Sequence, residues 1–246
     1  MAFRTEKAVG ALMAAALALP AAGQEFRYQA RHDHLRKSGA GTLLLDAQGI
    51  SFQETGKKKN KHTWRWALQD IQQLEIAPRS LRVLTYKDSK WKLGADRGYR
   101  FDLPPSQSFR DAYEFLKGRL DQRFVAALAD GGVTPLWRIP VKHLLRFGGS
   151  EGELVVGADR IVYSTDSKND ARTWRYADIE NVSSTGPFQL TLTTWERALA
   201  HYGNLKGYNF QLKEPLAEAR YTELWQRVNG TKGLKFLSYT ERNTDQ

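Results

Sequence analysis

The chain has 246 residues, enough for one large domain or for two domains of about 100 residues each. Hydrophobic residues make up 41% of it, as expected of a soluble globular protein with a buried core. The formal net charge is +10 and cysteine is absent, which excludes disulfides, thiol catalysis and thiolate metal sites.

Residues 1–23 have the pattern of a secretory signal peptide. Arg4 and Lys7 form a basic start, residues 8–19 are an Ala/Leu-rich run, and small residues lead up to Gly23. The run is shorter than the roughly 20 residues that span a bilayer. We therefore expect cleavage after Gly23 and export to the periplasm or the medium, with no transmembrane segment in the mature chain. An uncleaved amphipathic helix is the alternative, although the run has no polar face.

Two stretches of the mature chain repeat one pattern. Trp66 is followed four residues later by Asp-Ile, and so is Trp174. Flanking segments also align, with offsets that change by only a few residues: 26–32 with 137–143, 41–45 with 152–156, 49–52 with 160–163, and 99–103 with 208–212. A rival register would align Trp64, instead of Trp66, with Trp174. The repeat predicts two related units, a first half at residues 24–128 and a second half at residues 129–246.

The charge is shared unequally between these halves. The first half holds 20 Lys and Arg against 12 Asp and Glu, a net charge of +8, whereas the second holds 15 against 14, a net charge of +1. Such a basic excess bears on partners rather than on fold.

Each unit reads mainly as short strands. In residues 26–34 apolar and polar side chains alternate, which is typical of a half-buried strand. Residues 46–49 form a turn that ends in glycine, between strands at 43–45 and 50–52. A second hairpin is predicted around Asp88 and Ser89, from strands at 81–86 and 90–93, and a last strand at 99–103.

A helix is then expected to close each unit. In the first half Ser108 is a candidate N-cap, apolar residues follow at helical spacing from Phe109 to Leu120, and residues 130–132 stop the helix. In the second half the helix starts near Pro215 and stops at residues 229–230. Residues 129–136 would be a short linker.

Strands at this spacing, followed by one amphipathic helix, resemble the pleckstrin-homology-like superfold, nearest to its GRAM-type and bacterial versions. The resemblance covers residues 26–125 and 137–228. It implies an α+β, mainly β fold: two small antiparallel β-barrel or sandwich units, each closed by a C-terminal helix. Many members of that superfold bind anionic lipid head groups or peptides, although fold alone does not carry function over. The basic first hairpin of lipid-binding members is absent here, because residues 46–49 are short and acidic.

The densest basic cluster lies between the strands at 50–52 and 63–66. It suggests a contact with anionic lipid or another polyanion, and a second hairpin adds two lysines to it. The predicted anion-binding residues are Lys57, Lys58, Lys59, Lys61, Lys90 and Lys92. The alternative is a solvated hairpin tip, which is the usual fate of a charge run.

His32 and His34 are spaced like a pair of metal ligands on one strand face. The second half keeps His143 but has Leu145 in place of His34, so we favour a structural imidazole bonded to backbone. Asp70 and Asp178 recur in both halves and are expected to accept backbone N–H bonds at a turn.

No catalytic triad, phosphate-binding glycine loop or metal-ligand spacing stands out. The sequence therefore predicts an exported, non-enzymatic binding or scaffold protein without a cofactor. Its partner would be anionic lipid or another polyanion; nucleic acid is not expected. The alternatives are a protein-interaction module of an envelope assembly or, less favoured, a metal-binding protein that uses His32 and His34.

Overall fold

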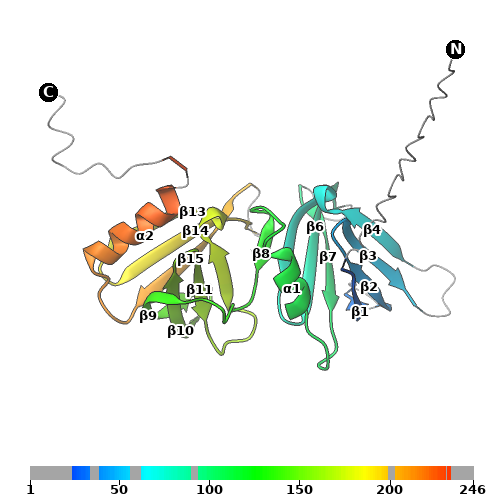
Figure 1. Ribbon diagram of the computed structural model, residues 1–246, viewed down its shortest axis with the longest axis horizontal. Helices are drawn as coiled ribbons and strands as arrows, with labels where there is room; N and C mark the ends of the chain where they lie inside the picture. Colours follow the sequence, from blue (N-terminus) through cyan, green and yellow to red (C-terminus); the bar gives the residue numbers. More distant parts are fainter. Residues whose placement is uncertain are drawn as a thin grey trace, which may run out of the picture.

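The structure is a computed structural model, and it describes residues 24–33, 39–55, 62–89, 94–198, 203–230 and 232–233. The expected signal peptide at residues 1–23 lies outside these ranges. Strands dominate the described chain, and Figure 1 shows them as two groups side by side, with β8 between them.

The described part of the first half holds eight strands, a helix and a short 3-10 turn. They are β1 (Phe26–His32), β2 (Gly39–Leu45), β3 (Gly49–Glu54), β4 (Thr63–Ala67), η1 (Leu68–Asp70), β5 (Ile71–Ile76), β6 (Ser80–Asp88), β7 (Asp96–Asp102), α1 (Arg110–Leu116) and β8 (Phe124–Ala126).

In the second half, the residues that the structure describes form seven strands, with a helix and a 3-10 turn at corresponding places. They are β9 (Pro135–Leu144), β10 (Gly149–Gly157), β11 (Arg160–Ser164), β12 (Arg172–Arg175), η2 (Tyr176–Asp178), β13 (Ile179–Gly186), β14 (Gln189–Arg197), β15 (Leu205–Leu212) and α2 (Glu218–Gly230).

The period of two read from the sequence is confirmed in β1. Its even-numbered residues Tyr28, Ala30 and His32 are buried, while the odd-numbered residues between them are exposed. The predicted turn between β2 and β3 is also present: the Asp46 carboxylate accepts the backbone N–H groups of Gln48 and Gly49, both at 2.8 Å. The expected strand at 90–93 lies outside the described residues.

The strand order repeats between the halves. The first half runs β5-β6-β7-β1-β2-β3-β4 and the second runs β13-β14-β15-β9-β10-β11-β12. Pairing decides between the two registers, because Ile50 faces Trp66 across β3 and β4 just as Ile161 faces Trp174 across β11 and β12. Trp66 and Trp174 are therefore the equivalent residues.

The expectation of two closed barrel or sandwich units was wrong. The fifteen strands of the described ranges form one continuous open sheet, which begins at β13 and ends at β4. The reason is β8, which pairs in parallel with β5 and in antiparallel fashion with β12, where Thr173 faces Ala126. Since β8 bridges the halves, neither closes on itself, and β4 and β13 are left as edge strands.

The first helix is also shorter than its sequence pattern predicted. It ends at Leu116, and residues 124–126, expected to be helical, form β8 instead. Its N-cap is Phe109 and not the predicted Ser108, although the Ser108 hydroxyl accepts the N–H of Arg110 at 3.2 Å. The second helix, by contrast, runs to Gly230 as predicted.

Buried side chains form two separate clusters, one in each half. The first cluster contains Trp66, Phe101 and Tyr113, and the second contains Trp174, Phe210 and Leu224. Each helix contributes to the cluster of its own half, so the apolar interiors remain distinct although the hydrogen-bonded sheet is continuous.

Candidate functional site

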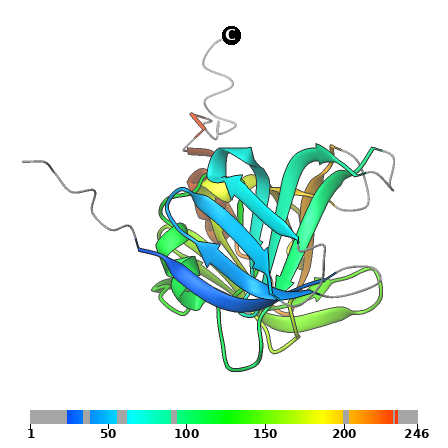
Figure 2. The ribbon, with the colours of Figure 1, turned by 90° about the vertical axis from the view of Figure 1, so that its right-hand side faces the viewer.

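The six predicted anion-binding lysines, at positions 57, 58, 59, 61, 90 and 92, lie outside the described residues. The strands that flank them are described, however. Strands β3 and β6 both run in the direction of β1, because β2 and β7 are each antiparallel to their neighbours. The ends of β3 and β6, and the starts of β4 and β7, therefore lie at the same end of the first half. Figure 2 looks onto the molecule from the side of these strands.

His32 lies at this end and is buried, with 4% of its surface exposed. Its ring centroid lies 4.6 Å from that of Trp64 and 5.3 Å from that of Phe101. The exposed His62 stacks on the other side of this group, 5.1 Å from Trp64 at an interplanar angle of 6°. The strand therefore places His32 in a buried aromatic cluster, which agrees with a core position; the backbone bond expected of its imidazole stays a prediction. His34 lies outside the described residues.

A buried carboxylate accompanies this cluster. Glu54, at the end of β3, is 6% exposed and accepts the backbone N–H of His62 at 3.0 Å. Gly39 gives it room, since a Cβ at that position would lie 2.5 Å from Oε1 of Glu54. This glycine faces His32 across β1 and β2, so the carboxylate occupies space beside the histidine strand.

The second half builds a corresponding site from different residues. His143 is buried, and its Nδ1 lies 2.9 Å from Oδ2 of Asp170. We expected this imidazole to bond to a backbone group. Its partner is instead the side-chain carboxylate of Asp170. Burial alone would raise the pKa of Asp170, but hydrogen bonds from His143 and Ser150 outweigh burial and hold the pKa below its usual value.

Ser150, His143 and Asp170 do not form a nucleophilic triad. Ser150 faces His143 across the strand pair, but its hydroxyl donates to Asp170 and contacts Tyr163 at 2.7 Å. A catalytic serine needs the imidazole as its proton acceptor. Here the carboxylate collects both donors, so the network ties the segment after β11 to the sheet.

Asp178 behaves as predicted, while Asp70 does not show the same contact. Oδ2 of Asp178 accepts the backbone N–H of Arg175 at 2.9 Å and also the Nε of that residue at 2.9 Å. Asp70 is exposed at the end of η1. At the position of Arg175 the first half has Ala67, which has no guanidinium to hold the Asp70 carboxylate in place.

The contact region between the two halves, called the seam below, contains charged groups around Asp130. The repeat pattern did not predict this cluster. Asp130, 3% exposed, accepts the Tyr113 hydroxyl at 3.0 Å and the Lys117 ammonium at 3.3 Å, and it also pairs with Arg160. Burial would raise the pKa of Asp130, but its hydrogen bonds, first among them the N–H of Gly132, lower it below the usual value.

A signal for this seam was present in the sequence as departures from the repeat. Arg160 stands where the first half has Gly49, and Arg175 stands where it has Ala67. Asp130 itself was interpreted only as part of a helix stop. A charge that replaces a small residue at a strand end in one half marks a contact that the other half lacks.

A second buried network lies beside the seam. The Arg172 guanidinium donates to the Tyr208 hydroxyl at 3.0 Å, Tyr208 donates to Glu196, and Lys206 pairs with Glu196 at 2.7 Å. Burial raises the pKa of Tyr208 well above its usual value, and the Glu196 charge adds to that effect.

Arg197, which follows Glu196 of this network, contacts two residues of the first half. The backbone N–H of Arg197 donates to the Gln73 side chain at 2.9 Å, and its guanidinium pairs with Asp96 at 3.1 Å. These charges are occupied in joining the halves, so they are poor candidates for ligand binding.

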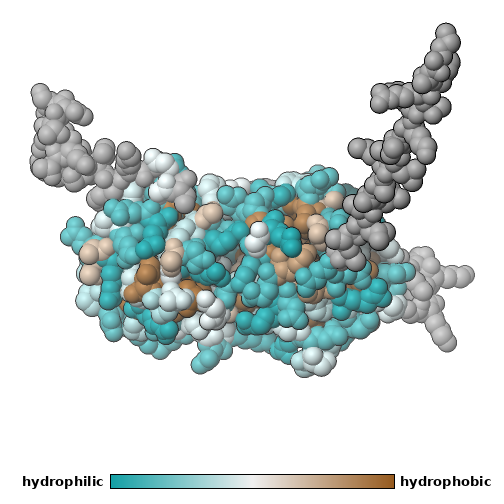
Figure 3. Space-filling model, in the orientation of Figure 1, coloured by the Kyte–Doolittle hydropathy of each residue, from teal (hydrophilic) through white to brown (hydrophobic). Residues whose placement is uncertain are grey.

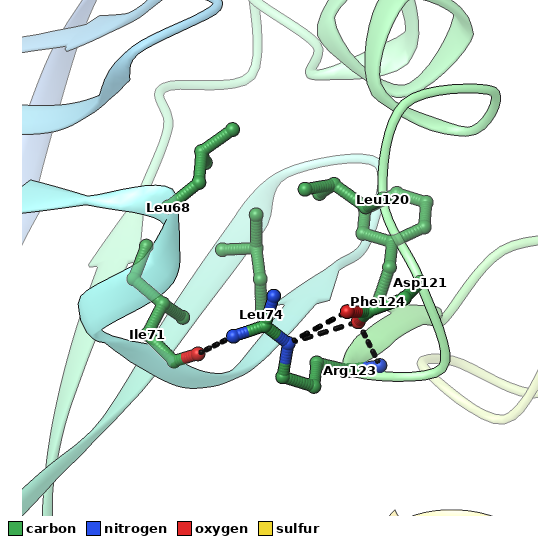
Figure 4. Close-up of a pocket in the computed structure, with 7 residues that line it drawn as sticks. All are labelled: Leu68, Ile71, Leu74, Leu120, Asp121, Arg123 and Phe124. Carbon is green, nitrogen blue, oxygen red and sulfur yellow. Dashed lines mark hydrogen bonds and ion pairs between the residues drawn. The ribbon is translucent and has the colours of Figure 1, made fainter.

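One small cavity lies between β5 and the segment that links α1 to β8. Figure 4 shows Leu68, Ile71 and Leu74 on one side and Leu120 and Phe124 on the other. Arg123 spans it, donating to the Ile71 carbonyl at 3.3 Å and to Asp121 at 2.9 Å. Its volume of about 10 Å³ has room for a single water molecule, too little for an organic substrate.

Within the described ranges, no three His, Asp or Glu side chains are arranged to hold a metal ion. In the same part of the chain, no helix has both the length and the apolar character needed to cross a membrane. Figure 3 shows a mainly hydrophilic face with only small hydrophobic areas.

No protein-family model matches the chain, and no curated protein matches it. Among solved structures it is similar to the C-terminal domain of an unknown protein from Leishmania infantum, with 13% identity over 49% of this chain and 94% of that one, at a TM-score of 0.30. It is also similar to the Spt16D Pob3N heterodimer, with 14% identity over 79% of this chain and 98% of that one, at a TM-score of 0.29. Scores this low carry no argument, and the resemblance to pleckstrin-homology-like domains stays a prediction.

Proposed function

We propose that the chain is an exported, non-enzymatic binding or scaffold protein whose basic first half contacts anionic lipid or another polyanion. The observation that carries the proposal is the common direction of β3 and β6. These two strands end at one end of the first half, and in the sequence they come directly before the two stretches that hold all six candidate lysines. The +8 charge of this half, against +1 for the second, supports the same assignment.

The energetics favour a weak surface contact. Each lysine near an anionic membrane contributes roughly 1 kcal/mol, so six contribute at most about 6 kcal/mol. That corresponds to a dissociation constant no lower than about 40 μM. Such binding depends steeply on salt, because the Debye length falls from about 8 Å at physiological ionic strength to about 3 Å at 1 M.

The non-enzymatic part of the proposal is supported by the interior. The cavity beside β8 admits about one water molecule, and the buried charges described above bind one another across the seam. Ser150, the one serine near a histidine and an aspartate in these described networks, donates to the carboxylate. These residues are therefore better explained as structural than as catalytic.

The test is vesicle co-sedimentation with a charge-reversed variant. Replacing Lys57, Lys58, Lys59 and Lys61 by Glu should leave the unfolding midpoint unchanged and abolish binding to vesicles rich in phosphatidylglycerol. A matched control reverses four basic residues of the second half that are at least partly exposed, namely Arg138, Lys142, Lys168 and Arg220. The control should retain most of the binding. Equal binding by both variants, or none by the unmodified chain, would remove the anionic-surface proposal.

A second candidate function is a protein-interaction module of an envelope assembly. The observation in its favour is the β9–β10 hairpin, which exposes Leu144, Leu145 and Phe147, the last with 84% of its surface exposed. Clustered apolar side chains of this kind mark contact sites. A pull-down from an envelope fraction at low and high salt separates the candidates, because apolar docking survives high salt and polyanion contact does not.

A further inference from the structure

Strand β8 shows how the segment after a helix joins the two halves of the sheet. It follows α1, pairs in parallel with β5 of its own half, and meets β12 of the second half where Ala126 faces Thr173. Phe124 anchors it, since this side chain is 5% exposed within the first apolar cluster. The edge of β12 is thus covered by a segment from the other half.

The sequence repeats this segment after α2. Residues 123–126 read Arg-Phe-Val-Ala, and residues 235–238 read Lys-Phe-Leu-Ser, at an offset of 112. Both have a basic residue, a phenylalanine, an aliphatic residue and a small residue in the same order. The phenylalanine follows the last helical residue by eight positions in the first half (124 − 116) and by six in the second (236 − 230).

The described chain after α2 starts along the same route. In the first half, the Arg123 guanidinium donates to the Ile71 carbonyl at the start of β5, at 3.3 Å. In the second half, the Lys232 ammonium donates to the Glu180 carbonyl at the start of β13. A basic side chain beyond each helix therefore contacts a carbonyl at the start of the corresponding strand, on its first residue in β5 and on its second in β13. Residues 235–238 follow closely on this contact.

Strand β4 has a side with no neighbouring strand. The carbonyl of His62 and the N–H of Leu68 form hydrogen bonds on the β3 side. In an antiparallel pair these groups alternate, so the N–H and C=O groups of the even-numbered residues of β4 point toward β3. The N–H and C=O groups that turn the other way belong to Thr63, Arg65 and Ala67. Strand β4 is last in the sheet order, so among the described strands none pairs with this side.

The uncovered side of β4 is equivalent to the side of β12 that β8 covers. Trp66 matches Trp174 in the strand register, so Arg65 matches Thr173, the residue that faces Ala126. An edge of this type accepts an extended segment through main-chain hydrogen bonds, while a side chain in a pocket supplies specificity.

We propose that residues 235–238 are the counterpart of β8: they extend β13 and pair with the β4 edge of another molecule of this chain. Figure 1 shows α2 and β13 at one end of the molecule and β4 at the opposite end. The contact therefore runs head to tail between molecules. Such a heterologous contact produces a ring or a growing filament. This assembly is independent of the anion binding proposed above.

The test is the mass of the purified chain as a function of concentration, measured by sedimentation velocity. The unmodified chain should show species heavier than one 28.0 kDa chain, in increasing amounts as concentration rises. Arg65→Pro removes one outward N–H and leaves the bonds to β3 intact, so this variant should stay monomeric. Arg65→Ala keeps the N–H and should still assemble. Phe236→Asp should also stay monomeric, because the aspartate cannot enter an apolar cluster as Phe124 does.

Mixing the two defective variants provides the decisive measurement. Arg65→Pro retains its 235–238 segment and Phe236→Asp retains its β4 edge, so an equimolar mixture should form pairs of chains and nothing larger. A peptide of residues 231–246 should bind the Phe236→Asp protein and should lose binding when its own phenylalanine is replaced by aspartate. This peptide measurement still applies if Arg65→Pro fails to fold. A chain that is monomeric at every concentration, or assembly that survives both substitutions, would overturn the proposal.

Discussion

The guanidinium of Arg175, in the second half, donates a hydrogen bond of 2.8 Å to the backbone oxygen of Leu120, in the first half. It also reaches the carbonyls of Lys117 at 3.1 Å and Asp121 at 2.9 Å. These carbonyls follow the end of α1, where an α-helix leaves acceptors without intrahelical donors. One side chain therefore satisfies the helix end of the other half and helps to turn the chain toward β8.

Replacing Arg175 by Ala should destabilise the chain by about 2 kcal/mol, because it leaves partly buried carbonyls and Asp178 without their charged donor. Urea unfolding of the two proteins measures the difference. Arg138→Ala is the matched control, since its pair with Glu153 is exposed and should contribute less than about 1 kcal/mol. Equal losses in the two variants would show that Arg175 does not brace the seam.

Asp130→Asn should cost about 3 kcal/mol at neutral pH, because the partly buried charges of Arg160 and Lys117 lose their buried partner. The pKa of Asp130 is lower in the folded chain than in the unfolded chain. Its contribution is therefore present above the unfolded value of about 3.9 and is lost as the pH falls through the folded pKa. The stability difference between the two proteins should be constant near neutral pH and shrink below about pH 4. Denaturant unfolding at a series of pH values measures this difference; one that persists in strong acid would contradict the assignment.

The sequence predicted the repeat and its core, but not the bridge between the halves. Trp66 and Trp174 recur because each fills the same position in its own apolar cluster, and such a requirement leaves a recognisable pattern. The continuous sheet depends on β8, which was missed because the helical spacing from Phe109 to Leu120 predicts a helix that extends to the stop at residues 130–132. That spacing is local, whereas the pairing of β8 with β5 and β12 is a tertiary interaction that overrides it.

The candidate site was predictable only in part, for a similar reason. The sequence indicated that His143 is structural, and its burial bears this out. Its partner Asp170 lies 27 residues away in the segment after β11, a contact that no local pattern encodes. In the first half, the carboxylate beside the histidine strand belongs to Glu54, with Gly39 leaving room for it. The two halves therefore share no sequence motif that would reveal the histidine–carboxylate site.

Tyr176→Phe tests, at high pH, a buried hydrogen bond that lies within the second half and does not involve the first. The Tyr176 hydroxyl donates to the Gly157 carbonyl at 2.6 Å, and its loss should cost about 1 kcal/mol at neutral pH. Burial raises the pKa of Tyr176 to about 12. Its contribution is therefore complete below the unfolded value of about 10 and is lost as the pH rises toward 12. The stability advantage of the unmodified chain should fall by about 1.4 kcal/mol per pH unit between pH 10 and 12, so it should vanish within the first unit and then reverse. Unfolding curves taken with tyrosinate absorbance measure this; a constant advantage would contradict it.

Gly41 and Gly152 are equivalent glycines in the repeat, and one physical requirement explains both. A Cβ at Gly41 would lie 2.4 Å from the Gln53 carbonyl oxygen, and one at Gly152 would lie 2.3 Å from the Ser164 carbonyl oxygen. Backbone oxygens cannot retreat without disturbing the neighbouring strand, so alanine at either position should cost roughly 1–3 kcal/mol.

Gly207→Ala is the control for both substitutions, because a Cβ there meets no atom within 4 Å. It also restricts the unfolded chain, so this variant should be as stable as the parent or more stable by up to about 1 kcal/mol. Guanidinium unfolding of the three variants measures the change in unfolding free energy. If close approach of the neighbouring strand requires glycine in the repeat, the change should be a loss for Gly41→Ala and Gly152→Ala and no loss for Gly207→Ala. Similar losses in all three would mean that strand β15 resists any added side chain and that the equivalence of Gly41 and Gly152 has no steric basis.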